Sequence, residues 1–311
     1  MISKQQRNNS QELPPESMFK DSFLDHKDLR RRREILRETV AKLKLHYEHY
    51  YQQSQNNLNK WSKQAQENSP DLFRKVAIDV YQGDWGVITQ FLTKKYGKCF
   101  AVLNMANNQV PGGGYIEGMV AQEENMFRRT DCHFSIRPEY VENYGNYKKE
   151  WTDLLNGVHG KVYLDTKDPR ICVRDFEIID HEDLGYAWLS DEDIFPFYEM
   201  RSAAVDLRSE IDFDLGIDID QGIAFDQQEC EQRIRAQFQT LVAANIKYVI
   251  LGAHGCGAFL NPTEKVAETY KKIIEDYKEH FNNISFAIFN AGYGPDNYTP
   301  FRRIISGVKK K

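Results

Sequence analysis

Residues 100–124 decide the fold and read FAVLNMANNQVPGGGYIEGMVAQEE. The first six residues form a short apolar run, which predicts a buried strand over 100–105. A glycine-rich loop follows, and a helix is expected over 118–129. A strand, a glycine-rich loop and a helix in this order are typical of an open α/β sheet, where ligands bind beyond the carboxyl ends of the strands.

The same alternation continues on both sides of this stretch. Further strands are expected over 73–80, 195–205, 248–251 and 284–289, and helices over 84–96, 226–245 and 262–280. Alternating strands and helices predict a largely parallel or mixed sheet with helices on both faces. Before residue 70, apolar side chains recur at helical spacing, which predicts one long helix over about 25–67. The basic run 30–33 near its start is expected to be a solvated helix face, with a phosphate-binding patch as the alternative.

These boundaries predict three regions: a disordered N-terminus over 1–21, a helical extension over 22–69, and one domain over 70–311 with an insertion at about 130–195.

Composition narrows the class of protein. The 311 residues carry a net charge of −5, which argues against general nucleic-acid or membrane-surface binding. No apolar run approaches the roughly 20 residues of a membrane-spanning helix, and the polar first 15 residues lack the apolar core of a secretory signal. The five cysteines are widely spaced without a CxxC pair, which predicts free thiols and neither a zinc site nor disulfides. We therefore expect a cytoplasmic monomer without a metal.

Two glycine-rich loops, 107–115 and 252–259, each follow an apolar strand. Glycine lets a backbone approach an anion closely, and N–H groups near a helix N-terminus supply donors, so two such loops suit a diphosphate. The alternative is a pair of tight turns between strand and helix. His254 within the second loop either donates to a phosphate oxygen or lies on the surface of the loop.

Two adjacent glutamates, Glu123 and Glu124, follow the first loop. Neighbouring helix residues point about 100° apart, so only one of them faces a ligand fully. A carboxyl group beside a diphosphate and near apolar residues holds its proton more tightly, as a general acid in glycoside cleavage requires. The alternative is two solvated glutamates in the first turn of a helix.

The segment 206–226 is strongly acidic, with seven carboxylates against a single arginine, Arg208. Carboxylates bind a guanidinium group in bidentate fashion, so Asp206 and Asp226 are candidates to bind an arginine leaving group. The alternative is a solvated acidic loop in which Asp226 caps the following helix.

Taken together, these motifs resemble the macrodomain fold, and specifically its microbial poly(ADP-ribose) glycohydrolase branch, whose hallmark is GGG, a short spacer and QEE. Residues 251–259 resemble the second phosphate loop of that family, and Gln82-Gly83-Asp84 resembles a motif near the start of the fold. The resemblance covers roughly residues 73–306. It implies a macrodomain-like three-layer α/β/α fold with a central mixed sheet, to which this chain adds its N-terminal helical extension.

The resemblance also implies roles for individual residues. Glu124 would protonate the leaving group and then activate water, while Glu123 would bind ribose hydroxyls. Asp84 would contact the adenine amino group, Asn107 the distal ribose, and Asn290 would lie near the adenine. The ADP-ribose would lie between two sets of residues: Gly112, Gly113, Gly114, Tyr115 and Gln122 on one side, and Gly252, His254, Gly255, Cys256, Gly257, Ala258 and Phe259 on the other. Members of this family need no metal and no other cofactor.

Two further stretches, 125–133 and 201–208, resemble effector-type macrodomains that remove ADP-ribose from arginine, including arginine on ubiquitin. The main expectation is therefore an ADP-ribosylhydrolase that acts on ADP-ribosylated protein at arginine, in the host cytosol if the protein is a translocated effector. A poly(ADP-ribose) glycohydrolase is the alternative within the same class. A non-catalytic ADP-ribose reader is the alternative from another class.

Overall fold

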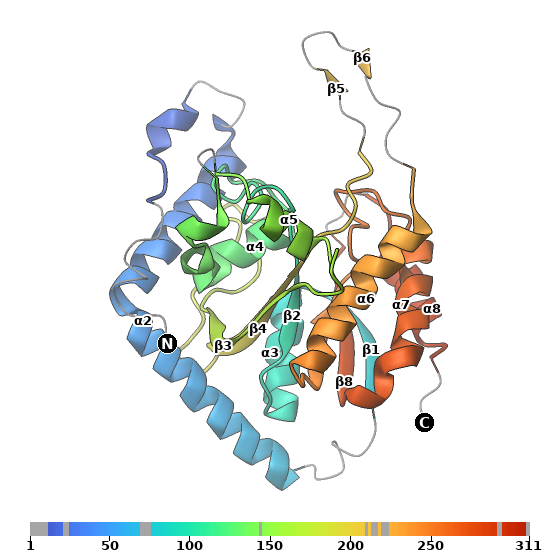
Figure 1. The fold of residues 1–311 in the computed structure, drawn as a ribbon. Helices are drawn as coiled ribbons and strands as arrows, with labels where there is room; N and C mark the ends of the chain where they lie inside the picture. The colour runs from blue at the N-terminus through green and yellow to red at the C-terminus, as the bar shows by residue number, and fades with distance from the viewer. Residues whose placement is uncertain are drawn as a thin grey trace.

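A central sheet of six strands organises the molecule (Figure 1). The computed structural model describes residues 12–20, 25–68, 76–142, 145–208, 211–212, 217–218, 224–290 and 294–308. In spatial order the strands are β1 (Ala77–Gln82), β8 (Asn283–Ile288), β7 (Tyr248–Leu251), β2 (Ala101–Met105), β4 (Phe195–Ser202) and β3 (Tyr163–Cys172). All neighbours are parallel except β3, which runs antiparallel to β4 at one edge. A separate two-stranded ribbon, β5 (Ile211–Asp212) and β6 (Ile217–Asp218), projects away from the body of the protein (Figure 1).

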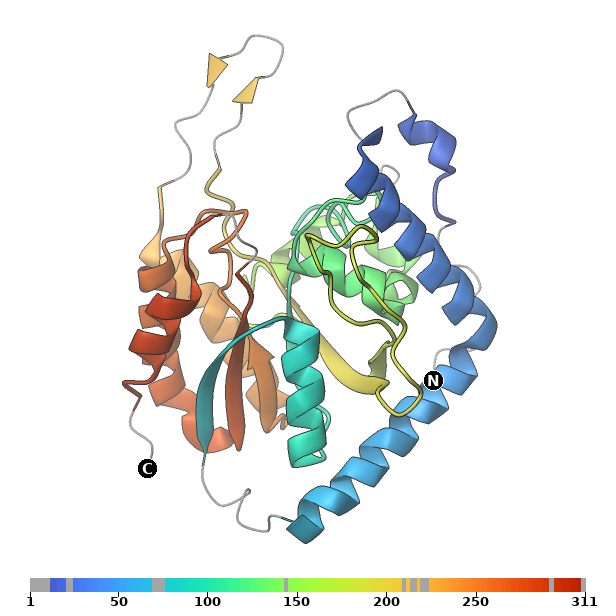
Figure 2. The ribbon, with the colours of Figure 1, turned by 180° about the vertical axis from the view of Figure 1, so that it is seen from behind.

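Helices cover both faces of the sheet, as Figures 1 and 2 show from opposite sides. One face carries α6 (Gln227–Ala243), α7 (Thr263–Tyr277) and α8 (Tyr298–Ile305), and the other carries α2 (Lys27–Asn68), α3 (Trp85–Tyr96) and α4 (Gln122–Arg129). Side chains alternate along the strands, so Leu103 joins the core under α6–α8 while Val102 joins the core under α2–α4. The predicted α/β fold with a mixed sheet between helical layers is confirmed.

Helix α3 shows how closely the sequence sets local structure. Asp84 accepts hydrogen bonds from the backbone of Gly86 and Val87 and so caps the first turn. Gly97 ends the helix in the left-handed conformation, with φ of 58°. A side chain at Gly97 would also collide with the backbone of Ser62 in α2. The prediction of a helix over 84–96 is confirmed.

Helix α2 corrects the expectation of a solvated basic face. Arg32 and Arg33 are buried, and their guanidinium groups pair with Glu177 at 2.7 Å and with Glu16 respectively. Both carboxylates lie on segments distant in sequence, which the pattern of α2 alone does not reveal. Arg32 and Arg33 therefore attach α2 to its surroundings, whereas Arg30 and Arg31 pair locally, with Asp25 and with Glu34 and Glu38.

Other differences lie around the expected insertion. The helix expected over 118–129 begins only at Gln122, because three glycines with positive φ, Gly112, Gly113 and Gly118, wind the preceding residues into turns. The region 130–195 contributes β3 to the sheet itself. The sequence analysis did not predict α5 (Lys149–Leu155), α8, or the short 3-10 helices η1 (Glu16–Phe19), η4 (Asp131–Ser135) and η5 (Pro138–Tyr140). The helix expected over 262–280 is α7 followed by the 3-10 helix η6 (Lys278–His280).

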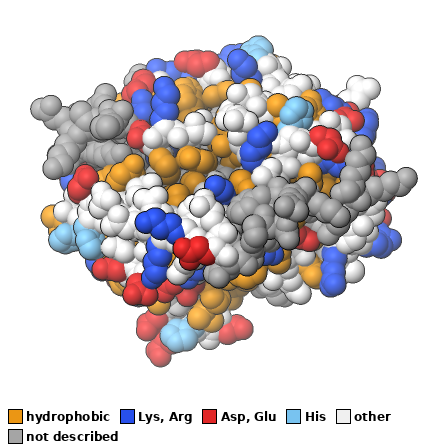
Figure 3. Space-filling view, turned by 90° about the horizontal axis from the view of Figure 1, so that it is seen from below, with side chains coloured by type: hydrophobic (Ala, Val, Ile, Leu, Met, Phe, Trp, Pro, Cys, Tyr) orange, Lys and Arg blue, Asp and Glu red, His pale blue; other side chains and the backbone are white. Residues whose placement is uncertain are grey.

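Within the described ranges, no helix combines the length and the apolar character needed to cross a bilayer. The same residues contain no group of three or more His, Cys, Asp or Glu side chains placed to hold a metal ion. Figure 3 shows the end of the molecule that lies at the bottom of Figure 1, where basic and acidic side chains are interspersed among apolar ones. That end lies opposite the carboxyl ends of the parallel strands.

Candidate active site

Parallel strands bring the predicted site residues to one end of the sheet, where the carboxyl ends of the strands lie. The strands β1, β8, β7, β2 and β4 all have their carboxyl ends there. The loops 106–121 and 252–261 follow β2 and β7, which are direct neighbours, and the segment 203–208 follows β4 on the other side of β2. The topology therefore places both glycine-rich loops next to each other, as ligand sites in open α/β sheets require.

The side chain of Gln122 ties the start of α4 to the end of β2. Its Oε1 accepts a hydrogen bond from the Met105 N–H at 2.9 Å, and its Nε2 donates to the Leu103 carbonyl at 3.0 Å. The amide thus pairs with the strand as a backbone group would. Gln122 fixes where the two following glutamates lie.

Glu123 is buried and holds the first glycine loop. Its carboxylate accepts hydrogen bonds from the backbone N–H of Asn107 at 2.7 Å and of Gly112 at 3.2 Å. Burial, and then the charge of Glu124, raises the pKa of Glu123 well above its usual value. The Asn107 side chain closes the same loop, since its Oδ1 accepts from the N–H groups of Gln109 and Val110.

Glu124 has one oxygen bound and one oxygen without a partner. Its Oε1 accepts from the Gly114 N–H at 3.0 Å, whereas its Oε2 is buried and makes no hydrogen bond within the described residues. Burial raises the pKa of Glu124 above its usual value. A Cβ at Gly113, where φ is 57°, would collide with Oε1 of this carboxyl group. A protonated carboxyl group with a free oxygen is what a general acid needs.

The side chain of an asparagine that the sequence analysis did not single out binds the second glycine loop through hydrogen bonds. Asn261 donates its side-chain N–H groups to the carbonyls of Val205, Gly255 and Phe259, at 2.7, 3.1 and 3.2 Å. Gly255 has φ of 74°, and Ala204 leaves no room for a side chain there. Gly257 and Ala258 are exposed, so their backbone faces solvent.

Two residues predicted to bind ADP-ribose have side chains turned into the protein. His254 is buried, and its Nε2 donates to the Ser202 carbonyl at 3.1 Å while Nδ1 lies 3.4 Å from the Gln237 amide. Burial lowers the pKa of His254 to about 4, so the ring is neutral near pH 7. The Tyr115 hydroxyl lies 2.9 Å from Nδ1 of buried His133. Both side chains are therefore engaged inside the protein, and only the backbones of His254 and Tyr115 are left to contact a ligand between the loops.

Cys256 is buried as well, and burial raises the pKa of its thiol. Its Sγ lies 3.7 Å from the His254 carbonyl. Gly252 lies against the side chain of Met105 at the end of β2. Gly252, the first residue of the second loop, thus lies against the strand that the first loop follows.

The residues predicted to lie near adenine already have partners in the protein. Asp84 caps α3 and also accepts from Nη1 of buried Arg129 at 2.8 and 2.9 Å. Asn290 is exposed and donates to Asp296 at 3.3 Å. Tyr293, three residues further along the chain, lies outside the described residues. A contact of Asp84 or Asn290 with adenine stays a prediction.

Asp206 lies beside the two loops, but an arginine already occupies its carboxylate. Arg208 donates from Nε to both oxygens of Asp206, at 2.8 and 3.1 Å. The Arg208 guanidinium lies 5.1 Å from the centroid of the Phe259 ring. Most of the remaining acidic segment lies outside the described residues.

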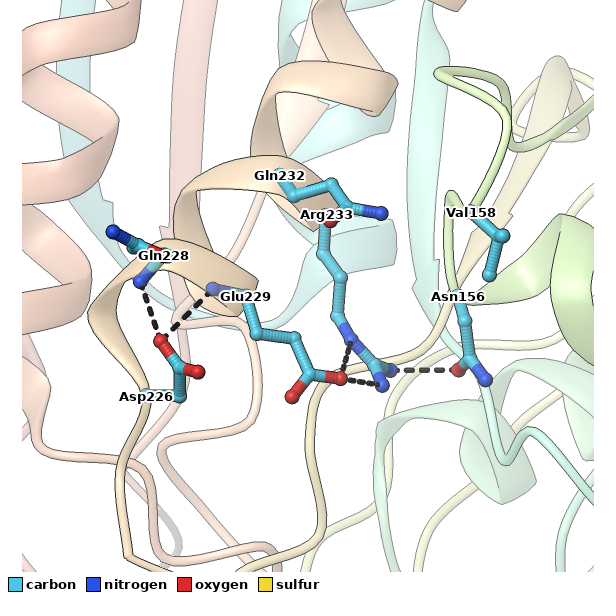
Figure 4. A pocket seen from close by; sticks show the side chains of 7 residues that line it. All are labelled: Asn156, Val158, Asp226, Gln228, Glu229, Gln232 and Arg233. Atoms are coloured by element: carbon cyan, nitrogen blue, oxygen red, sulfur yellow. Dashed lines mark hydrogen bonds and ion pairs between the residues drawn. The ribbon is translucent and has the colours of Figure 1, made fainter.

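Asp226 is not brought to the glutamates of α4. It caps α6 by accepting from the backbone N–H groups of Gln228 and Glu229, which was the structural alternative for this residue. Asp226 lines a polar pocket of about 360 Å³ that none of the α4 glutamates lines (Figure 4). The other lining residues are Asn156, Val158, Gln228, Glu229, Gln232 and Arg233.

A buried ionic network beside the site escaped the sequence analysis. Glu199 on β4 receives a bidentate pair from Arg201 at 2.7 and 2.9 Å and a further bond from Arg170 on β3 at 3.1 Å. Asn104 on β2 donates to the same carboxylate at 2.9 Å. All four side chains are buried. The only signal in the sequence was the presence of charged residues inside an otherwise apolar strand.

One family model matches part of this chain. The family model of the microbial-type PARG catalytic domain (PARG, poly(ADP-ribose) glycohydrolase) matches residues 27–163. That range includes α2, the first glycine loop and both glutamates, and it ends before β4 and the second loop. No curated protein matches the sequence.

Solved structures show the same fold at low sequence identity. The poly(ADP-ribose) glycohydrolase of Thermomonospora curvata bound to the inhibitor ADP-HPD is 19% identical, over 88% of this chain and 98% of that one, with a TM-score of 0.54. The Deinococcus radiodurans poly(ADP-ribose) glycohydrolase in complex with ADP-ribose is 20% identical, over 80% and 93%, with a TM-score of 0.51. The chain is thus similar in fold to these proteins, and the enzyme class expected from the sequence, a glycosidase-type hydrolase, is that of the matching family model.

Proposed function

We propose that this protein is an ADP-ribose glycohydrolase that binds ADP-ribose between its two glycine-rich loops and cleaves the glycosidic bond at the distal ribose. The observation that carries the proposal is the state of Glu124, which has one oxygen fixed by Gly114 and a second oxygen that is buried and finds no partner among the described residues. The matching family model supports the same reaction class.

In the proposed reaction, Glu124 donates its proton to the leaving oxygen as the bond between that oxygen and the anomeric carbon breaks. Positive charge develops on the ribose ring, and a water molecule then attacks the anomeric carbon. Glu124, now ionised, accepts a proton from this water and returns to its starting state. Glu123 holds the first loop in place through Asn107 and Gly112 and offers its carboxyl group to the ribose hydroxyls.

Poly(ADP-ribose) is the substrate that the observations favour over an arginine adduct. The family model is that of a polymer-cleaving enzyme. Of the two carboxylates expected to bind an arginine, Asp206 is paired with Arg208 and Asp226 caps α6. ADP-ribosyl-arginine on a protein such as ubiquitin is the second candidate, because the segment 206–226 has seven acidic residues. We also propose that the protein acts as a monomer in the cytoplasm.

The test compares release of free ADP-ribose from purified polymer and from arginine-linked protein by wild type and by Glu124→Gln. We expect wild type to release ADP-ribose mainly from polymer. Glu124→Gln should lose turnover yet bind ADP-ribose within about tenfold of wild type, a difference below ~1.4 kcal/mol. Release from the arginine adduct alone would favour the second candidate. Binding of ADP-ribose without release from either substrate would identify a reader instead.

A further inference from the structure

The loops around the proposed site contain a single basic side chain. Arg208 is the only Lys or Arg in the segments 83–84, 106–124, 203–226, 252–261 and 289–297. The same segments contain Glu117, Glu123, Glu124 and many further carboxylates. Among the described residues of these segments, Arg208 is therefore the one Lys or Arg side chain that a diphosphate could meet.

The backbone of the second glycine loop fixes the position of the segment that carries Arg208. The Leu207 N–H donates to the Phe259 carbonyl at 3.1 Å, and Asn261 donates to the Val205 carbonyl at 2.7 Å. Ala204 packs directly beneath Gly255. Arg208 is thus attached to the loop that we propose holds the diphosphate.

The guanidinium group of Arg208 is oriented but still open to a ligand. Its Nε and Nη2 both donate to Asp206, and its plane lies near the Phe259 ring. Its Nη1 makes no hydrogen bond within the described part of the chain, and 52% of the side chain is exposed. The hydrogen bond with Asp206 raises the pKa of Arg208, and the charges of Asp206 and Glu124 act in the same direction.

We propose that Arg208 is a substrate-binding residue that contacts the phosphate groups of ADP-ribose, and that Asp206 positions its guanidinium group. This inference rests on the proposed function and deepens it by naming a specificity determinant. It also gives Asp206 a role different from the predicted one. The sequence analysis expected Asp206 to bind an arginine leaving group, whereas here Asp206 orients Arg208 toward an anionic ligand. Nη1 of Arg208, which makes no hydrogen bond to a described residue, can donate to a phosphate oxygen, whereas Arg208 has no hydrogen-bond acceptor to offer the guanidinium of an acceptor arginine.

The experiment measures binding of ADP-ribose by calorimetry at low and at high salt, with adenosine as the probe that lacks phosphate. The variants are Arg208→Gln and Asp206→Asn. Arg303→Gln is the matched control, since Arg303 is exposed on α8 and pairs with Glu264. We expect Arg208→Gln to weaken ADP-ribose binding by roughly tenfold, the scale of one charge-assisted hydrogen bond, and to flatten the salt dependence. Asp206→Asn should weaken binding less, and Arg303→Gln should bind as wild type does.

Adenosine affinity should be the same in wild type and Arg208→Gln, which separates a phosphate contact from a general disturbance of the site. Equal ADP-ribose affinity and equal salt dependence in wild type and Arg208→Gln would overturn the inference while leaving the proposed function intact. Parallel losses for ADP-ribose and adenosine would also overturn it, because they indicate a structural role. A wild type that binds no ADP-ribose would refute the proposed function, and the role of Arg208 with it.

Discussion

Glu124 differs from the surface glutamates of this protein in the surroundings of its two oxygens. Gly114 binds one of them, and the other is buried without a hydrogen bond within the described residues. An ionised carboxylate in this position lacks the solvation that water would supply, so the neutral form is favoured. The charge of Glu117 acts in the same direction on the pKa of Glu124, and the charge of Glu124 in turn raises the pKa of Glu123.

The raised pKa of Glu124 predicts an alkaline limb in the pH profile of the reaction. Since the protonated carboxyl group is the proposed acid, kcat should fall as the pH rises through the raised pKa of Glu124. Rates measured on polymer across the pH range would show this limb. A kcat that stays constant up to the alkaline unfolding of the protein would argue against Glu124 as the acid.

The same shift has a consequence for stability. A carboxyl group with a raised pKa in the folded state stabilises the protein below its unfolded pKa of about 4.5, and this contribution is lost as the pH rises through the folded pKa. Wild type should therefore lose this stabilisation as the pH rises, whereas Glu124→Gln has no such group to lose it from. The difference between the Tm of Glu124→Gln and the Tm of wild type should thus become more positive at higher pH. Glu150→Gln, at an exposed site on α5, should show no such trend.

Helix α2 is packed into the body of the protein along much of its length. Leu36 and Trp61 belong to the core beneath α3 and β2, and Leu43 packs against β3. Arg33 donates to the Glu117 carbonyl at 3.1 Å, in the loop that precedes α4. The range matched by the family model also begins at residue 27, the first residue of this helix. These contacts argue that α2 unfolds together with the sheet.

Two leucines on α2 provide a matched test. Leu36 is 1% exposed and Leu45 is 78% exposed. Leu36→Ala should lower the free energy of unfolding by about 2–5 kcal/mol, because it leaves a cavity in the core, whereas Leu45→Ala should change it by less than about 0.5 kcal/mol. Denaturant titration followed by far-UV circular dichroism and by tryptophan fluorescence measures both. A separate helical extension over 22–69, as the sequence predicted, would instead give Leu36→Ala an additional early transition and leave the main one unshifted.

Across the whole molecule, the predictable features were those set by local pattern. Apolar runs predicted β2 and β7, and glycine spacing predicted the two loops. The unpredicted features depend on pairs far apart in the chain. Arg32 pairs with Glu177 and Arg170 pairs with Glu199 only once the fold has formed. The pattern of residues within one segment does not indicate which residue of a distant segment will be its partner.

The network around Glu199 joins three strands and so affects the stability of the whole sheet. Burial alone would raise the pKa of Glu199, but the charges of Arg201 and Arg170 and the hydrogen bonds from Arg201 and Asn104 lower it to about 2. Glu199→Gln leaves buried Arg201 without its counter-charge, while Arg170 keeps its pair with Asp165 at 2.7 Å, and the loss should cost about 3–5 kcal/mol at neutral pH. Because the folded pKa is lowered, the contribution of the carboxylate is present above the unfolded pKa of about 4.5 and is lost as the pH falls through about 2. Urea titrations from neutral pH downward should therefore show the gap between wild type and Glu199→Gln closing in this acidic window. A gap that stays constant to the lowest accessible pH would mean that the loss comes from packing rather than from the charge of Glu199.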